Sequence, residues 1–164
     1  MSPAQITLGR ALDEFEKEFP GIRDRFMVKD THRRFYLRFL KYDTKGKGRF
    51  LARAHFDRGG ATLAVAESAP GLRIGRNNSE TGILHLEEVS HEEHSAIFFP
   101  SYHFPRLTGP EFEPAWHDVT QSSDDQYSED TARWAIVFFA DVYGLPLPSE
   151  RATHQPWPGI PPSA

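Results

Sequence analysis

The sequence contains no cysteine among its 164 residues. This absence excludes disulfide bonds, thiolate nucleophiles, cysteine-ligated zinc fingers and iron–sulfur clusters. No apolar run approaches the roughly 18 residues that a membrane helix needs. The first residues lack the cationic and apolar regions of a secretory signal. The missing export signal predicts a cytoplasmic protein, and the missing apolar run predicts that no segment spans a membrane; the absence of cysteine does not bear on the compartment.

The composition is that of a folded domain, because 38% of the residues are hydrophobic and 26% are charged. The length predicts one globular α+β domain over residues 1–145. Residues 146–164 carry six prolines. We therefore expect them to form a Pro-rich, extended C-terminal tail.

Two segments have the signals of helices. In residues 2–19, Ser2 and Pro3 are typical of a helix start, and Gln5 completes a capping box with Ser2. The segment continues as an amphipathic stripe, which ends at a Pro-Gly pair. Residues 128–143 begin with a serine, are apolar nearly all round their middle, and are followed by Gly144. The second segment is therefore predicted to be a deeply buried C-terminal helix.

Alternating apolar residues predict strands between these helices. The turn-forming stretch DTKGKG lies between two alternating runs, residues 33–42 and 48–56, which predicts a hairpin. With flanking strands at 23–30 and 61–68, this hairpin would form an antiparallel meander, and residues 71–88 predict another hairpin. The expected fold is an antiparallel sheet of five to seven strands, packed by the two helices. A long loop rich in proline and aromatic residues would lie between the sheet and the second helix.

Charge is divided unevenly along the chain. Residues 21–60 hold twelve Lys or Arg and four Asp or Glu, whereas residues 61–164 hold five and fifteen. A basic sheet face that carries an aromatic ring suits single-stranded nucleic acid or another anion. Alternatively, the acidic part of the chain neutralises the basic segment within the molecule or across a homodimer. The candidate anion-binding residues are Arg34, Tyr36, Arg38, Arg49 and Arg53.

Residues 85–103 concentrate four of the eight histidines and four glutamates. Ser90 and Glu93 form a capping-box pattern, so a short helix is expected, on which His91 and His94 would share a face. With His103 they form a candidate metal site, although ordinary structural roles for these histidines remain the alternative. His117, beside Asp118, is a further candidate for an oriented base.

The order of helix, four strands, long loop and late helix resembles the ubiquitin-conjugating-enzyme skeleton. The stretches GRFLARAHFDRGGATLAVAES and NNSETGILHL carry this resemblance, which covers about half of the chain. That family's His-Pro-Asn triplet and catalytic cysteine are both missing. The resemblance therefore implies a non-catalytic, protein-binding relative.

Serine-nucleophile and phosphate-loop motifs are also missing, so the sequence favours a non-catalytic adaptor that binds a protein partner without a cofactor. Aromatic residues in the Pro-rich loop are the expected anchors for that partner, since aromatic side chains dominate interface energies. The alternatives are nucleic-acid binding through the basic face and a metal-dependent enzyme that uses the histidine-rich stretch. The predicted anchors are Tyr102, Phe104, Phe112 and Trp116.

Overall fold

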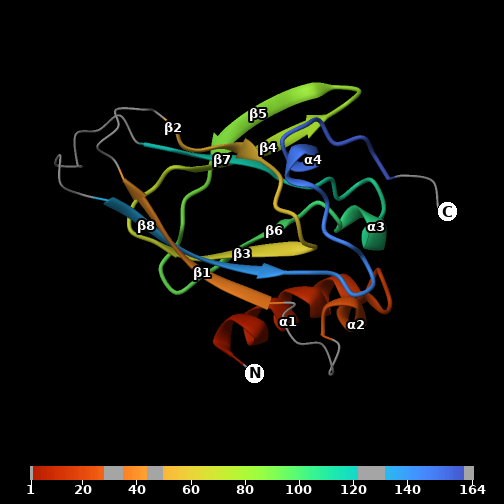
Figure 1. Cartoon of the computed structure of the whole chain (residues 1–164). Coiled ribbons are helices and arrows are strands. Elements are labelled where there is room, and N and C mark those ends of the chain that lie inside the picture. Colours follow the sequence, from red (N-terminus) through yellow and green to blue (C-terminus); the bar gives the residue numbers. More distant parts are fainter. Residues whose placement is uncertain (1, 28–34, 44–49, 122–131, 161–164) are drawn as a thin grey trace.

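A computed structural model of the chain describes residues 2–27, 35–43, 50–121 and 132–160. Eight strands and four helices make up the described part (Figure 1). The helices are α1 (Pro3–Glu16), α2 (Ile22–Phe26), α3 (Pro105–Thr108) and α4 (Glu150–Thr153). The strands are β1 (Phe35–Asp43), β2 (Phe50–His55), β3 (Ala61–Glu67), β4 (Leu72–Asn78), β5 (Gly82–Glu88), β6 (Ile97–Pro100), β7 (Trp116–Thr120) and β8 (Ala132–Ala140).

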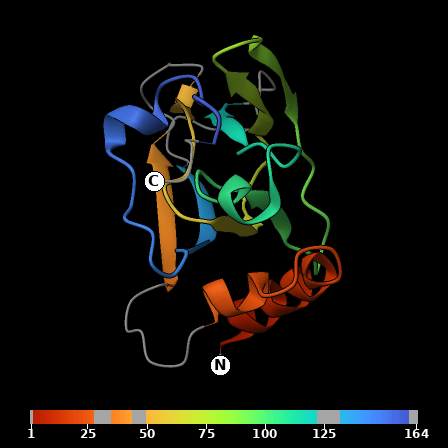
Figure 2. The ribbon, with the colours of Figure 1, turned by 90° about the vertical axis from the view of Figure 1, so that its right-hand side faces the viewer.

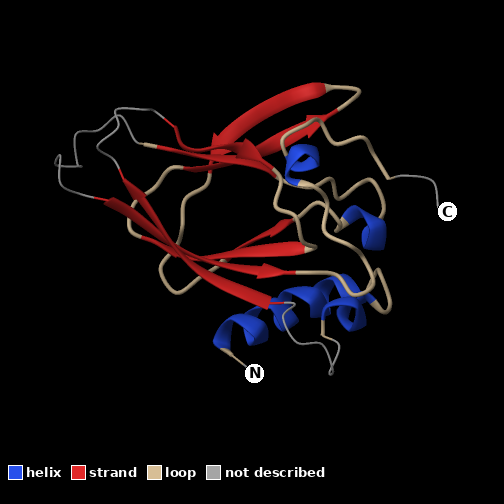
Figure 3. Cartoon of the chain, viewed as in Figure 1, coloured by secondary structure: helices blue, strands red, loops and turns tan. Residues whose placement is uncertain are grey.

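The strands form two antiparallel four-stranded sheets that face each other (Figure 3). One sheet has the order β1-β8-β3-β6 and the other has the order β2-β7-β4-β5. Strands that follow one another in the chain alternate between the sheets at most steps, which is the topology of a jelly roll. The coarse expectation of an α+β protein with antiparallel sheet is confirmed, but the single sheet of five to seven strands is wrong.

Two apolar clusters hold these layers together. The first joins the outer face of the β1-β8-β3-β6 sheet to α1 and α2, which lie below that sheet in Figure 1, through residues such as Leu12, Phe26 and Phe138. The second includes Leu72, Phe99 and Val119, which come from both sheets and therefore pack between them. The cap of α1 is as predicted, since Gln5 N–H donates to Ser2 Oγ and Ser2 N–H donates to Gln5 Oε1.

The predicted buried helix over 128–143 is wrong, because residues Ala132–Ala140 form strand β8. This strand pairs with β1 on one side and β3 on the other. Most residues of this central strand are buried or half-buried, so it is apolar at successive positions and its hydrophobic pattern resembles that of a buried helix. The aromatic and β-branched residues Ile136, Val137 and Phe138 fit the strand.

The predicted meander is also wrong. β1 and β2 are consecutive in sequence but belong to different sheets, because β1 pairs with β8 and β2 pairs with β7. The expected strand over 23–30 overlaps α2, and residues 28–34 lie outside the described part. Without a meander, the resemblance to the ubiquitin-conjugating skeleton does not hold.

Two further local predictions have different outcomes. The hairpin predicted over 71–88 is confirmed by β4 and β5, whose turn is closed by Asn78 Oδ1 accepting hydrogen bonds from the N–H groups of Glu80 and Thr81. The short helix expected from Ser90 is not formed; the chain there leads into β6, which pairs with β3. Partners distant in sequence override the local capping signal.

The C-terminal segment returns to the body of the molecule. It contains α4, and the side chain of Trp157 is buried. The backbone N–H of Trp157 donates to the carbonyl oxygen of Asn77 at 2.8 Å. Figure 2 views the molecule from the side on which α3 and α4 lie. Among the described residues, no helix has the length and apolarity required to span a membrane.

Candidate metal centre

Three side chains meet between the two sheets. Nε2 of His55 lies 3.6 Å from Oδ1 of Asp57, and Nε2 of His117 lies 3.7 Å from the same oxygen. The candidate ligand atoms of these residues all lie within 4.8 Å of one another. Within the described part of the chain, no other group of three His, Asp or Glu residues comes this close.

The strands bring the two histidines together. His55 ends β2, and the antiparallel register of β2 and β7 places it opposite His117. Asp57 follows two residues after His55, in the turn that leads to β3. This turn packs tightly, because a Cβ atom at Gly60 would lie 2.3 Å from Val142 and 2.6 Å from Phe26. A larger residue at position 60 would therefore displace the segment that carries Asp57.

Backbone carbonyls orient both imidazole rings. Nδ1 of His55 lies 2.7 Å from the carbonyl oxygen of Arg53, and Nδ1 of His117 lies 3.0 Å from that of Ala115. A carbonyl only accepts hydrogen bonds, so each Nδ1 carries the proton. Each neutral ring then directs the lone pair of Nε2 toward Asp57, which is the tautomer that a metal ligand requires.

Hydrogen bonds also fix Asp57. The hydroxyl of Thr62 donates to Oδ2 of Asp57 at 2.6 Å, and Ser101 Oγ lies 2.9 Å from the same hydroxyl. Since Thr62 has one hydroxyl proton, Ser101 must donate to Thr62. Oδ2 is thus held by a buried chain of hydroxyl groups, and Oδ1 faces the two imidazole rings.

The local electrostatics favour an anionic carboxylate. Burial opposes ionisation of Asp57, but the positive charges that His117 and His55 carry when protonated, together with the hydrogen bond from Thr62, lower its pKa below the usual value. Burial lowers the pKa of His117. Burial has the same effect on His55, but the hydrogen bond and charge of Asp57 outweigh it and raise the pKa of that residue. One carboxylate beside two imidazoles is a suitable donor set for a divalent transition metal.

A cluster of aromatic rings supports the segments that carry the ligands. Phe56, between His55 and Asp57, packs edge-on against Trp116, with ring centroids 4.8 Å apart, and Trp116 precedes His117. Trp157 completes this buried cluster, and the N–H of Phe56 donates to Thr153 O at 2.8 Å. The C-terminal segment therefore braces both ligand-bearing strands.

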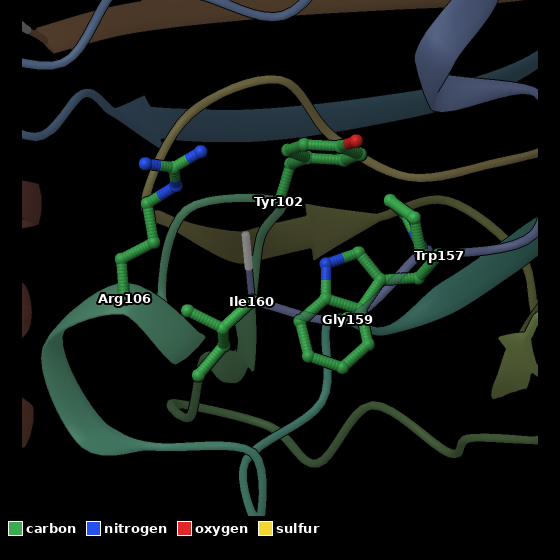
Figure 4. A pocket seen from close by; sticks show the side chains of 6 residues that line it. Tyr102, Arg106, Trp157, Gly159 and Ile160 are labelled. Carbon is green, nitrogen blue, oxygen red and sulfur yellow. The ribbon is translucent and has the colours of Figure 1, made fainter. Parts of the chain in front are cut away.

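Trp157 also forms one wall of a small cavity of about 110 Å³. Figure 4 shows its indole ring below Tyr102, with Arg106 and Ile160 on the other side of the cavity. The cavity lies next to the aromatic cluster, because Phe56 also contacts the ring of Tyr102. Its size leaves room for little more than a few water molecules.

A larger cavity of about 600 Å³ opens beside His55 and Asp57. Its walls come from the facing edge strands β1 and β2, from β8 and from the C-terminal segment around α4. His154 of that segment stacks on His55, with ring centroids 5.6 Å apart. This volume is in the range typical of small-molecule sites.

Two ion pairs lie outside this cavity's lining, one with a partly exposed arginine and a buried carboxylate and the other buried on both sides. Arg73 binds Asp118 through two hydrogen bonds, Nε to Oδ1 at 2.9 Å and a terminal nitrogen to Oδ2 at 2.6 Å. Arg133 pairs with Glu67 and donates to the carbonyl oxygen of Ala69 at 3.0 Å. Asp118 therefore serves Arg73 and does not orient its neighbour His117.

The structure places the histidines of the predicted metal site apart from this centre. His94 is exposed, and Nε2 of His91 lies 3.0 Å from Ser95 O. His103 is buried, with Nε2 2.9 Å from Pro146 O. These three histidines do not form a ligand group among the described residues.

The aromatic residues predicted to anchor a partner mostly pack inside the molecule. Phe104 and Trp116 are buried, and Phe112 contacts the rings of Phe15 and Phe19. Tyr102 lines the small cavity described above. Their contacts are those of core residues.

Three of the five residues predicted to bind an anion line the larger cavity, and the other two are not described by the structure. Tyr36, Arg38 and Arg53 all line the larger cavity beside the metal centre. Arg34 and Arg49 fall outside the described residues. Two strands from different sheets thus contribute to one basic wall.

The sequence pattern singles out His117 but gives no link between it and His55 or Asp57. The available signal was a His-x-Asp triplet at the end of a strand, with a second histidine on a later strand. The neighbouring arginines give this strand a charge pattern that suggests an anion-binding face instead. Spacing alone could not show that β2 and β7 pair.

The fold and the site together define a jelly roll with a candidate mononuclear metal centre between its sheets. The chain matches no protein-family model and no curated protein sequence. Solved structures do share its fold. A Shewanella oneidensis protein provisionally described as an oxygenase superposes with a TM-score of 0.65 at 20% identity, covering 92% of this chain and 57% of that one.

Two further solved structures are similar to the chain. Arabidopsis thaliana dioxygenase for auxin oxidation 1, in complex with 2-oxoglutarate, has a TM-score of 0.62 at 14% identity, covering 91% of this chain and 50% of that one. Neurospora crassa T7H, in complex with α-KG and thymine, has a TM-score of 0.52 at 18% identity, covering 77% and 40%. The chain spans about half the length of the structures that it matches.

The prediction of a non-catalytic, protein-binding adaptor is contradicted by these findings. The fold is that of oxygenase-type structures, and the chain has a His–Asp–His cluster at a cavity. Both observations favour the metal-dependent enzyme that the sequence left as an alternative. The residues involved are His55, Asp57 and His117.

Proposed function

We propose that the chain is a metal-dependent oxygenase that uses iron(II) and a 2-oxo acid such as 2-oxoglutarate. The cluster of His55, Asp57 and His117 carries this proposal. Two histidines and one carboxylate on one side of an ion, with the remaining positions open, are the donor set of non-haem iron(II) oxygenases. The 2-oxo acid is suggested by the similar structures, two of which are complexes with 2-oxoglutarate or α-KG.

The residues present fit an iron(II) ion. The two Nε2 atoms lie 3.6 and 3.7 Å from Oδ1 of Asp57, and the Nδ1 atoms are already occupied by carbonyl oxygens. The negative charge of Asp57 offsets one of the ion's two positive charges, and the neutral imidazoles add none. His55 and Asp57 line the 600 Å³ cavity, so the open positions of an ion would face space for a ligand.

When bound, iron(II) and 2-oxoglutarate supply an oxidation in which one oxygen atom of O₂ enters a substrate C–H bond. The other oxygen atom is taken up as 2-oxoglutarate is converted to succinate and CO₂. His55, Asp57 and His117 would hold the ion. Leu40, Phe139 and Leu147 add apolar side chains to the cavity wall, which would limit the water around a bound ligand.

Metal titration tests the proposal directly. Protein purified anaerobically without a histidine tag should bind one iron(II) or manganese(II) per chain. When O₂ and ascorbate as reductant are then supplied, the iron form should slowly convert 2-oxoglutarate to succinate and CO₂ even without a substrate, the second oxygen atom being reduced to water. His117→Ala and Asp57→Ala should lose both properties. His85→Ala, which removes an exposed histidine of β5, is the matched control and should retain them.

Metal stoichiometry tests whether the chain binds an ion, and succinate formation tests whether it uses a 2-oxo acid. A wild-type protein that binds no more metal than His117→Ala would refute the metal centre. A protein that binds the metal but never forms succinate would refute the 2-oxo acid. Circular dichroism of each variant establishes that the fold is retained.

A further inference from the structure

We infer that the small cavity between Tyr102, Arg106 and Trp157 is a binding site for a compact oxyanion such as phosphate or sulfate. This cavity is separate from the candidate metal centre and from the larger cavity beside it, since the two cavities share no lining residue. The inference therefore goes beyond the proposed oxygenase function, and it depends on neither a metal nor a 2-oxo acid.

Three hydrogen-bond donors line the small cavity. They are the guanidinium of Arg106, the hydroxyl of Tyr102 and the indole N–H of Trp157. Figure 4 shows the indole nitrogen on the edge of the ring that is turned toward Ile160 and Arg106. Within the described part of the chain, none of these three groups has a hydrogen-bond acceptor or an ion-pair partner. Such donors suit a ligand that only accepts hydrogen bonds.

The charge of the small cavity favours an anion. Arg106 lines it, whereas no Asp or Glu among the described residues does. Burial raises the pKa of the Tyr102 phenol, and the positive charge of Arg106 only partly opposes this shift. The phenol is therefore protonated at neutral pH and can donate a hydrogen bond. A guanidinium beside two neutral donors matches the oxygens of phosphate or sulfate.

Backbone hydrogen bonds hold two walls of the small cavity in place. The backbone N–H of Tyr102 donates to Asp57 O at 2.9 Å, and that of Trp157 donates to Asn77 O at 2.8 Å. The side chain of Trp157 is only 5% exposed, so its indole is held within the aromatic cluster. A site with fixed walls loses little conformational freedom when a ligand binds.

A turn at Gly159 brings the remaining wall into place. Its φ of +86° lies in the left-handed region that favours glycine, and Ile160 follows directly. Pro158 and Ile160 give the small cavity apolar surface beside the guanidinium of Arg106. Apolar surroundings limit the water around the guanidinium and strengthen its attraction for an anion.

The size of the small cavity limits the ligand to a compact ion or head group. A volume of about 110 Å³ holds a few water molecules, and phosphate or sulfate needs about the same space. A nucleobase, a sugar or a peptide segment does not fit inside it. The oxyanion therefore has two sources: a free inorganic ion, or the phosphate group of a larger molecule whose remainder lies outside the cavity.

Isothermal titration calorimetry on metal-free protein tests the site. Sodium phosphate, sodium sulfate and glycerol 3-phosphate are the probes, and sodium chloride keeps the ionic strength constant. Arg106→Gln should weaken phosphate and sulfate binding by roughly ten- to a hundredfold, since it removes charge-assisted hydrogen bonds. Tyr102→Phe and Trp157→Phe keep an aromatic ring but remove a neutral donor, and each should weaken binding roughly three- to tenfold.

Arg38→Gln is the matched control. It removes an arginine that lines the larger cavity, so it should bind phosphate as the wild type does. Circular dichroism establishes that each variant is folded. Tighter binding of glycerol 3-phosphate than of phosphate would identify the phosphate group of a larger molecule as the ligand, and weaker binding would identify the free ion.

Two results would overturn the inference. In one, the wild-type protein binds neither phosphate nor sulfate. In the other, Arg106→Gln binds both ions as tightly as Arg38→Gln does, or the loss occurs in Arg38→Gln instead, which would place the ion in the larger cavity. Failure of the proposed metal centre would leave these results unchanged, because every titration is made without a metal.

Discussion

The hydroxyl of Thr62 donates a 2.6 Å hydrogen bond to Oδ2 of Asp57, and both side chains are buried. Replacing Thr62 with valine keeps the shape but leaves Oδ2 without this donor. We expect Thr62→Val to lower metal affinity about tenfold, because partners of ligating carboxylates tune the site. The free energy of unfolding should fall by about 1–3 kcal/mol.

Metal titration and urea denaturation measure these two effects. Thr7→Val is the control, since Thr7 is exposed and its hydroxyl donates only to the carbonyl of Pro3 in its own helix. An unchanged metal affinity in Thr62→Val would show that this hydrogen bond does not support the centre.

The brace formed by the C-terminal segment gives a second prediction. Trp157→Ala removes an indole that packs with Phe56 and Trp116, and it should cost about 3–5 kcal/mol of stability. It should also weaken metal binding, since Phe56 and Trp116 adjoin the ligands. Trp134→Ala is the control, because Trp134 is 50% exposed on β8 and far fewer of its contacts are lost.

Thermal unfolding and metal titration compare the two tryptophan variants. Equal destabilisation by both substitutions, or full metal affinity in a folded Trp157→Ala protein, would contradict the role of the C-terminal segment as a brace.

The ion pair between Arg73 and Asp118 gives a third prediction. Arg73→Ala leaves the carboxylate of Asp118 buried without its partner, so we expect a loss of about 3 kcal/mol in unfolding free energy. Lys17→Ala disrupts an exposed pair with Glu14 and should cost less than about 1 kcal/mol. Chemical denaturation of both variants tests this difference, and similar losses would count against a structural role for the Arg73 pair.

The dependence of stability on pH can be predicted for His103. Burial lowers the pKa of His103 in the folded protein. The unfolded chain, in which the pKa is about 6.5, therefore binds protons that the folded chain does not. The contribution of His103 to stability is present above pH 6.5 and is lost as the pH falls toward the folded-state pKa.

Comparison of wild type with His103→Gln isolates this effect. The variant's unfolding free energy should decline less steeply with acidification below pH 6.5 than that of the wild type. Urea denaturation of metal-free protein at several pH values measures both slopes. Parallel curves would show that His103 does not titrate differently in the two states; His85→Gln, which removes an exposed histidine, should parallel the wild type.

The local elements of this fold could be predicted because their signals lie within a few residues of one another. The capping box of α1 and the hairpin of β4 and β5 depend on contacts between neighbours in sequence. β8 could not be distinguished from a helix in this way. Its apolar pattern results from pairing with β1 and β3, and both partners lie far from it in the sequence.

The sequence by itself determined that cysteine chemistry is impossible, that the domain is mixed and antiparallel, and that positive charge gathers on the early strands. Only the tertiary structure decided where the candidate metal centre lies. His55 and His117 are 62 residues apart, and the pairing of β2 with β7 brings them to one carboxylate. Such pairing depends on how two whole sheets bury their inner faces, and the spacing of residues along the chain does not record it.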